Sequence, residues 1–307
     1  MKALITGSEG FVGKYLRKEL ENNGYQIVRA DLIPAPDVRA IDLLDATGVS
    51  RLIEEEQPDC VFHLAAQADV GKSWKMPQMT MQLNVTAAIN VMEAVRAVNG
   101  EKCRIVMVGS ADQYGNLGTA GEMVHEETGM KPQSPYAVSK RAQEDMARLY
   151  VQVYGMKICM TRSFNHGGAG QRTGFMIADF AEGIVQVEKG IKRDLLVGNL
   201  TSRRDFTHVK DVVRAYRLIA EKGRPGEVYN VGSGTTRSAQ EILDRMIAMA
   251  KCPIPVRQDP ARMRPSDTPV ICCDHGKLTR DTGWTPEITL DTILQDTIAY
   301  YRGIHHD

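Results

Sequence analysis

The stretch TGSEGFVG, residues 6–13, decides the fold of this 307-residue chain. It follows the short apolar run ALIT and opens a segment, FVGKYLRKELENNG, whose apolar residues recur at helical spacing. In such a strand–turn–helix unit Gly7 permits the tight turn, Gly10 the close approach of a pyrophosphate, and Gly13 the close packing of helix on sheet. Free N–H groups at the helix N-terminus attract the phosphates. The stretch therefore predicts a dinucleotide-binding site.

Strand-like and helical segments alternate through the first half of the chain. The expected strands are the apolar runs YQIVRAD, CVFHLAA, RIVMVGS and KICMTRSFN, and helical patterns separate them, including a long one over about 77–98. This alternation predicts an α/β fold of the Rossmann type, which is a doubly wound parallel sheet with helices on both faces.

In the second half the pattern loosens, and five prolines interrupt residues 253–269. We expect a smaller, loop-rich C-terminal lobe that covers the carboxyl ends of the strands and binds substrate. The expected domains are a dinucleotide-binding domain at 1–164, rejoined by about 205–235, and a substrate lobe made of 165–204 and 236–307.

The composition argues against several classes of protein. Lys plus Arg and Asp plus Glu both number 38, so there is no basic excess of the kind that nucleic-acid binding needs. The six cysteines form no CxxC pair and no zinc-ligand spacing, which indicates thiols in a reducing compartment and no metal site. The apolar stretch in MKALITGSEG is too short for a signal peptide or a membrane span. We expect a cytoplasmic protein without nucleic-acid or membrane partners.

An acidic residue at the end of the second expected strand, Asp31, addresses the choice of dinucleotide. A carboxylate there accepts hydrogen bonds from the adenosine ribose hydroxyls and repels a 2′-phosphate. The sequence therefore favours NAD(H). NADP(H) stays open because Arg29 is close by in the chain.

Three further residues form a coherent acid–base group. Tyr136 and Lys140, in SPYAVSK, are four residues apart and so share one face of a helix that is expected to begin with Ser134 as its N-cap. Ser110 ends the fourth expected strand. A phenol has a pKa of about 10, which a neighbouring ammonium and the nicotinamide charge would lower. Ser110 would hold a substrate oxygen while Tyr136 transfers the proton and the nicotinamide the hydride.

Taken with HLAA at 63–66, these motifs resemble the extended short-chain dehydrogenase/reductase family over essentially the whole chain. The resemblance implies a Rossmann domain, a small C-terminal nucleotide-sugar-binding lobe, and a homodimer that pairs through the Tyr136 helix and the helix near 85–98. It also implies more cofactor-binding residues than the glycines, Asp31, Tyr136 and Lys140. These are Phe11, Val12, Leu32, Asp42, Leu43, Leu64, Ala65, Ala66, Asn84 and Val108.

The C-terminal half narrows the resemblance to enzymes of GDP-sugars. TRSFNHGGAGQ resembles the segment whose asparagine, here Asn165, contacts the sugar diphosphate. VGNLTSRRDFTHVKDVVRAY resembles GDP-sugar reductases and dehydratases, with Arg204 as the phosphate ligand, and RMRPSD supplies Arg264 as a second. Two guanidinium groups suit a diphosphate because their planar forks match phosphate oxygens.

The residue at position 112 distinguishes a dehydratase from a reductase in this family. GDP-mannose 4,6-dehydratases carry a glutamate two residues after the Ser or Thr, whereas this chain has Asp112. The aspartate is one methylene shorter, and a displacement of roughly 1 Å can cost about 10²-fold in rate. EGFVGKYL and FNHGGAGQ also resemble the reductases, so we expect Asp112 to be a substrate-binding residue.

The expected reaction is hydride transfer from NAD(P)H to the C4 keto group of GDP-4-keto-6-deoxy-D-mannose, giving GDP-D-rhamnose or a related GDP-6-deoxyhexose. A GDP-mannose 4,6-dehydratase and another nucleotide-sugar epimerase remain alternatives. A non-catalytic nucleotide-binding regulator is the alternative outside enzymes, although such proteins typically lose the Tyr/Lys pair, which is intact here at Tyr136 and Lys140.

Overall fold

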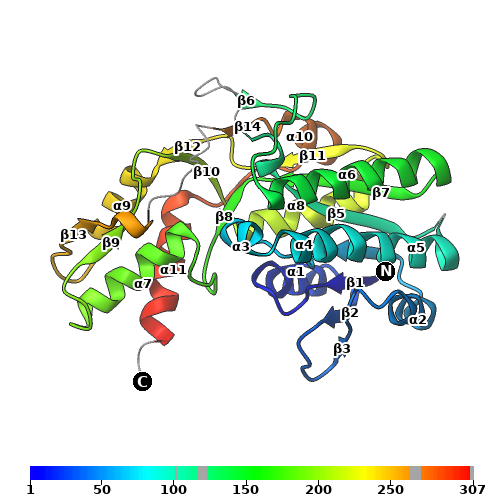
Figure 1. The fold of residues 1–307 in the computed structure, drawn as a ribbon, viewed down its shortest axis with the longest axis horizontal. Coiled ribbons are helices and arrows are strands. Elements are labelled where there is room, and N and C mark those ends of the chain that lie inside the picture. The colour runs from blue at the N-terminus through cyan, green and yellow to red at the C-terminus, as the bar shows by residue number, and fades with distance from the viewer. Residues whose placement is uncertain (101, 116–122, 263–270, 305–307) are drawn as a thin grey trace.

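A computed structural model describes residues 1–100, 102–115, 123–262 and 271–304 (Figure 1). Within these residues, seven parallel strands form one sheet in the order β11-β7-β5-β4-β1-β2-β3. The strands are β1 (Lys2–Thr6), β2 (Gln26–Asp31), β3 (Val38–Ala40), β4 (Cys60–His63), β5 (Arg104–Ser110), β7 (Lys157–Ser163) and β11 (Val228–Val231). The chain runs outward from β1 to β3 and then returns to β4 on the other side of β1, so the sheet has a topological switch point between β1 and β4.

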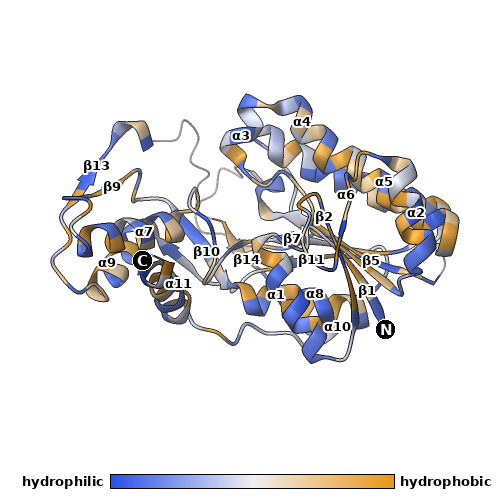
Figure 2. Cartoon of the chain, turned by 90° about the horizontal axis from the view of Figure 1, so that it is seen from below, coloured by the Kyte–Doolittle hydropathy of each residue, from blue (hydrophilic) through white to orange (hydrophobic). Residues whose placement is uncertain are grey.

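Helices cover both faces of this sheet, as Figure 2 shows. One face carries α2 (Ala46–Glu56), α5 (Ala87–Asn99) and α6 (Pro135–Tyr154), and the other carries α1 (Phe11–Asn22), α8 (Val209–Lys222) and α10 (Gly276–Thr282). The central strands are buried on both sides, and for that reason their sequences read as continuous apolar runs. The predicted Rossmann-type fold is confirmed.

A smaller group of elements packs around its own apolar core beside the sheet (Figure 1). Its helices are α7 (Met176–Glu188), α9 (Ala239–Ala248) and α11 (Leu290–Ile304), with the 3₁₀ turn η3 (Pro260–Arg262). Its strands form two small sheets, one of β8 (Asn165–Gly167), β10 (Arg203–His208) and β12 (Thr236–Ser238), the other of β9 (Leu195–Val197) and β13 (Val256–Gln258). We call this group the C-terminal lobe.

Short elements link the two parts. A strand pair, β6 (Met123–Val124) with β14 (Cys272–Cys273), joins chain regions that are far apart in the sequence. The 3₁₀ turn η2 (Ala111–Gln113) follows β5 directly. Between the lobe elements β10 and β12, the chain returns to the large sheet through α8 and β11.

The long helix predicted over about 77–98 has an interruption. The structure has α3 (Val70–Lys75), then α4 (Pro77–Met81), a π-helical turn η1 (Gln82–Thr86), and α5. A π-helical turn widens the helix by one residue and often occurs at a functional site. No helix among the described residues combines the length and the apolar character needed to span a membrane.

Candidate active site

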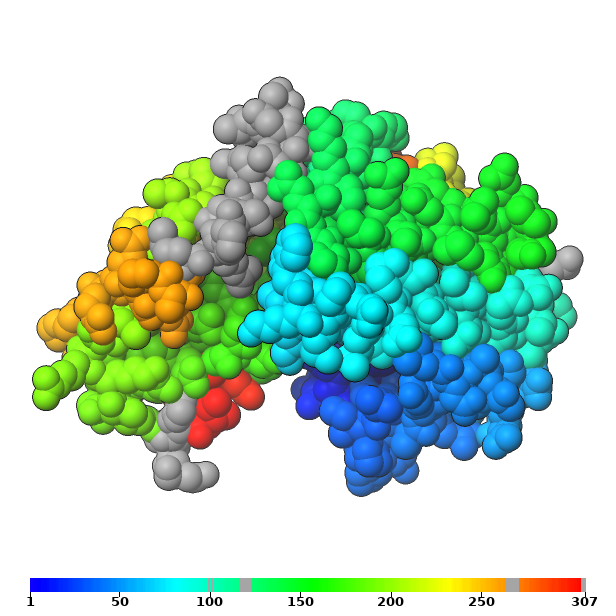
Figure 3. Space-filling model, in the orientation of Figure 1, coloured from blue at the N-terminus to red at the C-terminus, as the bar shows by residue number. Residues whose placement is uncertain are grey.

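A cavity of about 1310 Å³ lies where the C-terminal lobe meets the carboxyl ends of β1, β2, β4 and β5. Figure 3 shows the molecular surface hollowed between the cyan α3–α4 region and the green lobe. A crevice at the carboxyl ends of parallel strands, next to the switch point, is where α/β proteins of this topology bind ligands. Nearly all of the residues predicted for a cofactor or substrate line this one cavity.

The turn after β1 forms a cradle in which side chains would not fit. Gly7 has a left-handed backbone with φ of +72°, and a Cβ there would lie 2.9 Å from the backbone nitrogen of Ala65. A Cβ on Gly13 would lie 2.3 Å from the carbonyl oxygen of Gly7. The backbone of this turn is therefore open to the cavity at the N-terminus of α1, which fits a dinucleotide pyrophosphate.

Asp31 lies at the end of β2 and lines the same cavity. Its carboxylate accepts hydrogen bonds from the backbone N–H of Glu9, at 2.9 Å, and of Ile33, at 3.1 Å. Arg29 is paired with Glu9, Nη1 to Oε1 at 3.4 Å, and donates to the carbonyl oxygen of Pro36. The carboxylate that favours NAD(H) and the guanidinium that leaves NADP(H) open therefore lie on either side of Glu9.

The other predicted cofactor residues fall into two groups. Those that line the cavity are Gly10, Phe11, Val12, Leu32, Asp42, Leu43, Leu64, Ala65, Ala66 and Val108. Asn84 does not: the structure places its side chain in the interior, within the π-helical turn η1. Its Oδ1 accepts a hydrogen bond from the backbone N–H of Gln67 at 2.7 Å, and its Nδ2 donates to Oγ of Ser139 at 2.9 Å. In the structure these two partners engage the Asn84 amide, and the predicted role of Asn84 in binding the cofactor stays a prediction.

Tyr136 and Lys140 lie in the first two turns of α6, where the predicted cap is present: Oγ of Ser134 accepts from the N–H of Ala137 at 3.1 Å. Lys140 is buried, and its Nζ donates to the carbonyl oxygen of Val108 at 2.8 Å and to Oε1 of Gln143 at 2.9 Å. Burial lowers the pKa of Lys140 to about 7.

Ser110 ends β5 and begins η2. Its Oγ accepts from the backbone N–H of Asp112 at 3.2 Å, while the Asp112 side chain is exposed to the cavity. Burial raises the pKa of Tyr136, the negative charge of Asp112 raises it further, and a hydrogen bond with Ser110 acts in the opposite direction. Without a bound cofactor, Tyr136 is therefore a neutral phenol at neutral pH.

On the side of the C-terminal lobe, the cavity is lined by Asn165 and Arg204, while Arg264 lies outside the described residues. His166, next to Asn165, also lines the cavity, and its ring stacks on Phe11 with an interplanar angle of 5°. The lobe and the glycine turn are thus in direct contact over the cavity.

Several cavity residues were not anticipated from the sequence. Ser163 and Tyr216 line the cavity and share a hydrogen bond of 2.6 Å between Oγ and the phenol oxygen. Ser163 ends β7, and a polar residue at the carboxyl end of a buried parallel strand is a signal that could have identified it.

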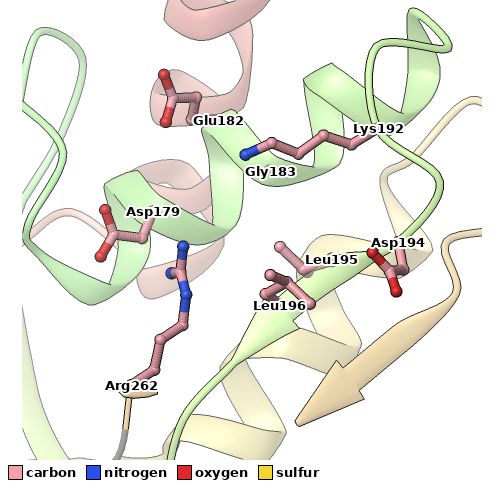
Figure 4. Close-up of a pocket in the computed structure, with 8 residues that line it drawn as sticks. All are labelled: Asp179, Glu182, Gly183, Lys192, Asp194, Leu195, Leu196 and Arg262. Carbon is pink, nitrogen blue, oxygen red and sulfur yellow. The ribbon is translucent and has the colours of Figure 1, made fainter. Parts of the chain in front are cut away.

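Arg262 also lines the large cavity, and no sequence motif marks it. It borders a second, small pocket of about 30 Å³ on the lobe, lined also by Asp179 and Lys192. Figure 4 shows the Arg262 side chain extending from η3 toward α7, with its guanidinium on the side of Asp179. The lobe therefore places a guanidinium where no motif indicated one.

The glycine turn and the group of Ser110, Tyr136 and Lys140 open onto the same cavity, the first from β1 and the second from β5 and α6. Extended short-chain dehydrogenases/reductases are built in this way, and the resemblance seen in the sequence is confirmed. Comparison with known proteins gives the family. The sequence model described as GDP-mannose 4,6 dehydratase matches residues 4–297, so the chain belongs to that family.

Relatives whose names state different enzymatic activities share this fold. The chain is 35% identical over 303 residues to GDP-6-deoxy-D-mannose reductase of Pseudomonas aeruginosa, covering 98% of this chain and 97% of the relative. It superimposes with a TM-score of 0.90 on the structure of RMD from Pseudomonas aeruginosa complexed with NADPH, at 32% identity and 99% coverage of both chains. The TM-score is 0.89 with the UDP-glucose 4-epimerase of Thermus thermophilus in complex with NAD, at 28% identity and 99% coverage of both.

Proposed function

We propose that this chain is an NAD(P)(H)-dependent oxidoreductase that reduces the C4 keto group of GDP-4-keto-6-deoxy-D-mannose, giving GDP-D-rhamnose or a related GDP-6-deoxyhexose. The observation that carries this direction of reaction is Asp112, which lines the cavity at the position where GDP-mannose 4,6-dehydratases carry a glutamate. Ketone reduction needs a proton donor at the carbonyl oxygen, and a neutral phenol beside Ser110 is that donor. The similarity to a GDP-6-deoxy-D-mannose reductase supports the substrate class.

Each residue of the group has one task in this reaction. Bound NAD(P)H supplies the hydride that becomes the C4 hydrogen of the sugar. Tyr136 gives its proton to the C4 oxygen, and the hydroxyl of Ser110 donates a hydrogen bond to the same oxygen. Lys140, one helical turn away, carries a proton that stabilises the phenolate left behind. The lobe lines one side of the site with Asn165 and Arg204.

Elimination of water, the reaction of a dehydratase, needs an acid that reaches the C6 hydroxyl. Asp112 is exposed to the cavity but is one methylene shorter than the glutamate of that reaction. We therefore assign Asp112 to binding the sugar and to keeping Tyr136 protonated.

The cofactor assignment includes both nicotinamide nucleotides, with NAD(H) favoured because Asp31 lines the cavity at the end of β2. Among the relatives, one structure contains NADPH and another NAD. The glycine turn and the residues around Leu64 would hold either.

The diphosphate of the substrate is assigned to Arg204, Asn165 and Arg264. Arg204 and Asn165 line the cavity from the side of the C-terminal lobe, which supports this assignment. We take residues 165–204 and 236–307 to be the nucleotide-sugar-binding lobe and 1–164, with about 205–235, to be the cofactor domain, with two changes to these bounds. The strand β10 continues in the lobe to His208, and α10 packs on the large sheet.

We also propose a homodimer that pairs through α5 and α6. The outer face of α6 exposes Leu149, Val153 and Tyr154, which is more apolar surface than a solvated helix face normally carries. A mass in sedimentation equal to one chain of 34.0 kDa would contradict the dimer. A cytoplasmic location is part of the proposal, since all six cysteines are free thiols.

A paired assay on the purified chain tests the reaction. We expect net oxidation of NADH or NADPH when GDP-4-keto-6-deoxy-D-mannose is the substrate. We expect no 4-keto product from GDP-mannose with NAD⁺ or NADP⁺. Accumulation of the 4-keto sugar from GDP-mannose would instead establish a dehydratase. The variant Arg204→Gln should raise the KM for the sugar nucleotide and leave the affinity for the reduced cofactor unchanged.

A further inference from the structure

Behind Ser110 lies a buried polar network that the reaction described above does not use. Gln113, the last residue of η2, is completely buried, and its Oε1 accepts a hydrogen bond from the backbone N–H of Ser110 at 3.0 Å. Its Nε2 donates to Oε2 of Glu144 at 2.7 Å. One amide side chain thus joins the end of β5 to α6.

Glu144 belongs to the same stripe of α6 as the two other functional residues of that helix. Tyr136, Lys140 and Glu144 are spaced four residues apart, so they lie on one face of the helix in successive turns. All three are buried. The helix therefore presents Tyr136 to the cavity and is joined to the Ser110 backbone through Glu144 and Gln113.

The charge of Glu144 is fixed by two arginines. Arg162 on β7 donates to both carboxylate oxygens, Nε at 2.9 Å and Nη2 at 2.7 Å, and Arg148 on α6 donates to Oε1 at 3.1 Å. Burial alone would raise the pKa of Glu144, but the hydrogen bonds and charge of Arg162 outweigh it and the pKa is lowered. An ionised carboxylate only accepts hydrogen bonds.

This fixes which way the Gln113 amide points. Its NH₂ group must face Glu144, so its oxygen must face the N–H of Ser110, and the reverse orientation would set two acceptors against each other. Space for this arrangement comes from Gly109, where a Cβ would lie 2.7 Å from Oε1 of Gln113 and 2.3 Å from the carbonyl oxygen of Thr161. The orientation of the amide is thus determined by partners on two other elements.

We propose that Gln113 is a positioning residue for the reaction: oriented by Glu144, it holds the backbone of Ser110 and so sets the place of the Ser110 hydroxyl relative to Tyr136. The Oγ of Ser110 accepts from the N–H of Asp112 and is also hydrogen-bonded with Tyr136, so the place of this hydroxyl depends on the backbone that Gln113 holds. Because Ser110 and Tyr136 must meet one substrate oxygen, an error of roughly 1 Å between them can cost about 10²-fold in rate. The inference rests on the proposed function in one respect only: it requires that Ser110 and Tyr136 contact the same substrate oxygen.

The variant Gln113→Met tests the proposal, because it keeps the length and volume of the side chain and removes both hydrogen bonds. We expect kcat to fall between about 10-fold and 10²-fold, with the Kd for the reduced cofactor, measured by fluorescence titration, unchanged. Gln186→Met is the matched control, since it alters a half-buried amide on α7 away from the cavity and should leave kcat as it is. Should Gln113→Met fail to fold, Gln113→Asn, which is too short to join Ser110 to Glu144, takes its place.

A double-mutant cycle with Ser110→Ala separates positioning from a general structural role. If Gln113 acts through Ser110, then Gln113→Met should change kcat by less than about twofold when Ser110 is already alanine. The same fold-loss in both backgrounds would overturn the proposal. Hydrogen exchange adds a reading without turnover: the amide of Ser110 should exchange faster in Gln113→Met, and unchanged protection would also overturn it.

The cycle is measured with whichever nucleotide sugar the wild-type chain turns over. A wild-type chain that does not reduce GDP-4-keto-6-deoxy-D-mannose but acts on another sugar contradicts the proposed function and leaves the cycle interpretable. Additive losses contradict only the role of Gln113.

Discussion

The ammonium group of Lys140 donates a hydrogen bond of 2.8 Å to the carbonyl oxygen of Val108, two residues before Ser110. This contact ties α6 to the end of β5 inside the cavity wall. Since the pKa of Lys140 is lowered to about 7 by burial, the lysine holds or releases its proton near neutrality. It is therefore not a permanent cation at neutral pH.

Replacing Tyr136 by phenylalanine should remove the proton donor and leave the cavity otherwise unchanged. We expect kcat to fall by about 10²–10⁴-fold, which is the usual contribution of a general acid. An assay that follows the oxidation of the reduced cofactor measures the loss of kcat. Fluorescence titration should show an unchanged Kd for the cofactor. Tyr154→Phe, on the same helix but exposed, is the control and should keep full activity. Equal losses in both variants would remove Tyr136 from its role.

Replacing Asp112 by asparagine should move the pH profile of the reduction. The charge of Asp112 raises the pKa of Tyr136, so removing that charge lowers this pKa. Reduction needs the protonated phenol, and the fall of kcat/KM at alkaline pH should therefore begin at a lower pH in Asp112→Asn. A profile measured with the wild type and the variant in the same buffers gives the comparison. An unshifted alkaline limb would mean that Asp112 does not act on Tyr136.

Replacing Asp31 by asparagine should alter cofactor preference. Asp31 accepts from Glu9 through Oδ2 and from Ile33 through Oδ1. Asparagine keeps one acceptor oxygen and so one of these two hydrogen bonds, but it no longer repels a 2′-phosphate. The ratio of kcat/KM for NADPH to that for NADH should rise at least about tenfold, or ~1.4 kcal/mol. Asp37→Asn, an exposed position near Arg29, serves as the control. If this ratio does not change, a residue other than Asp31 determines the choice between NADH and NADPH, and Arg29 is the first candidate.

Replacing Gly13 by alanine should disrupt the cradle. The added Cβ would lie 2.3 Å from the carbonyl oxygen of Gly7 and 2.6 Å from that of Ser8, and both are backbone atoms that cannot move aside cheaply. We expect the cofactor Kd to rise at least about 10²-fold, or ~2.7 kcal/mol, with a lower melting temperature. Gly129→Ala, where nothing lies within 4 Å of the added Cβ, is the matched control. Normal cofactor binding by Gly13→Ala would contradict the assignment of this turn.

Local signals were enough to predict the elements that position the site. The helix that begins at Pro135 has its cap at Ser134, and α1 begins at Phe11, directly after the glycine turn. The alternation of apolar runs and helical patterns predicted the parallel sheet because a parallel crossover needs a helix between strands. Gly7 was predictable because its positive φ belongs to the turn itself, and Gly13 because its Cβ would meet the carbonyl oxygen of Gly7 in the same turn.

Contacts between distant parts of the chain were beyond such reasoning. Arg162 and Glu144 form a buried ion pair. In the sequence Glu144 is an ordinary charged residue of a helical segment, and nothing around Arg162, in the apolar run KICMTRSFN, identifies its partner. Asn84 was predicted to bind the cofactor, whereas in the structure its amide contacts Gln67 and Ser139. Neither the extra residue of a π turn nor an ion pair between a helix and a strand has a local sequence signature, since both depend on which elements become neighbours.

The π-helical turn at Gln82–Thr86 also bears on how this region can change during evolution. Each residue of an α-helix accounts for about 100° of rotation. Because the π turn holds one residue more than an α-helical turn, deleting a single codon inside it would leave a regular helix with α5 in the same register. Deleting a codon between this turn and Met92 would instead rotate the residues beyond the deletion by that amount, and Met92, which belongs to the core against the sheet, would turn toward solvent. Single-residue deletions should thus be tolerated within the π turn and not in the regular part of α5.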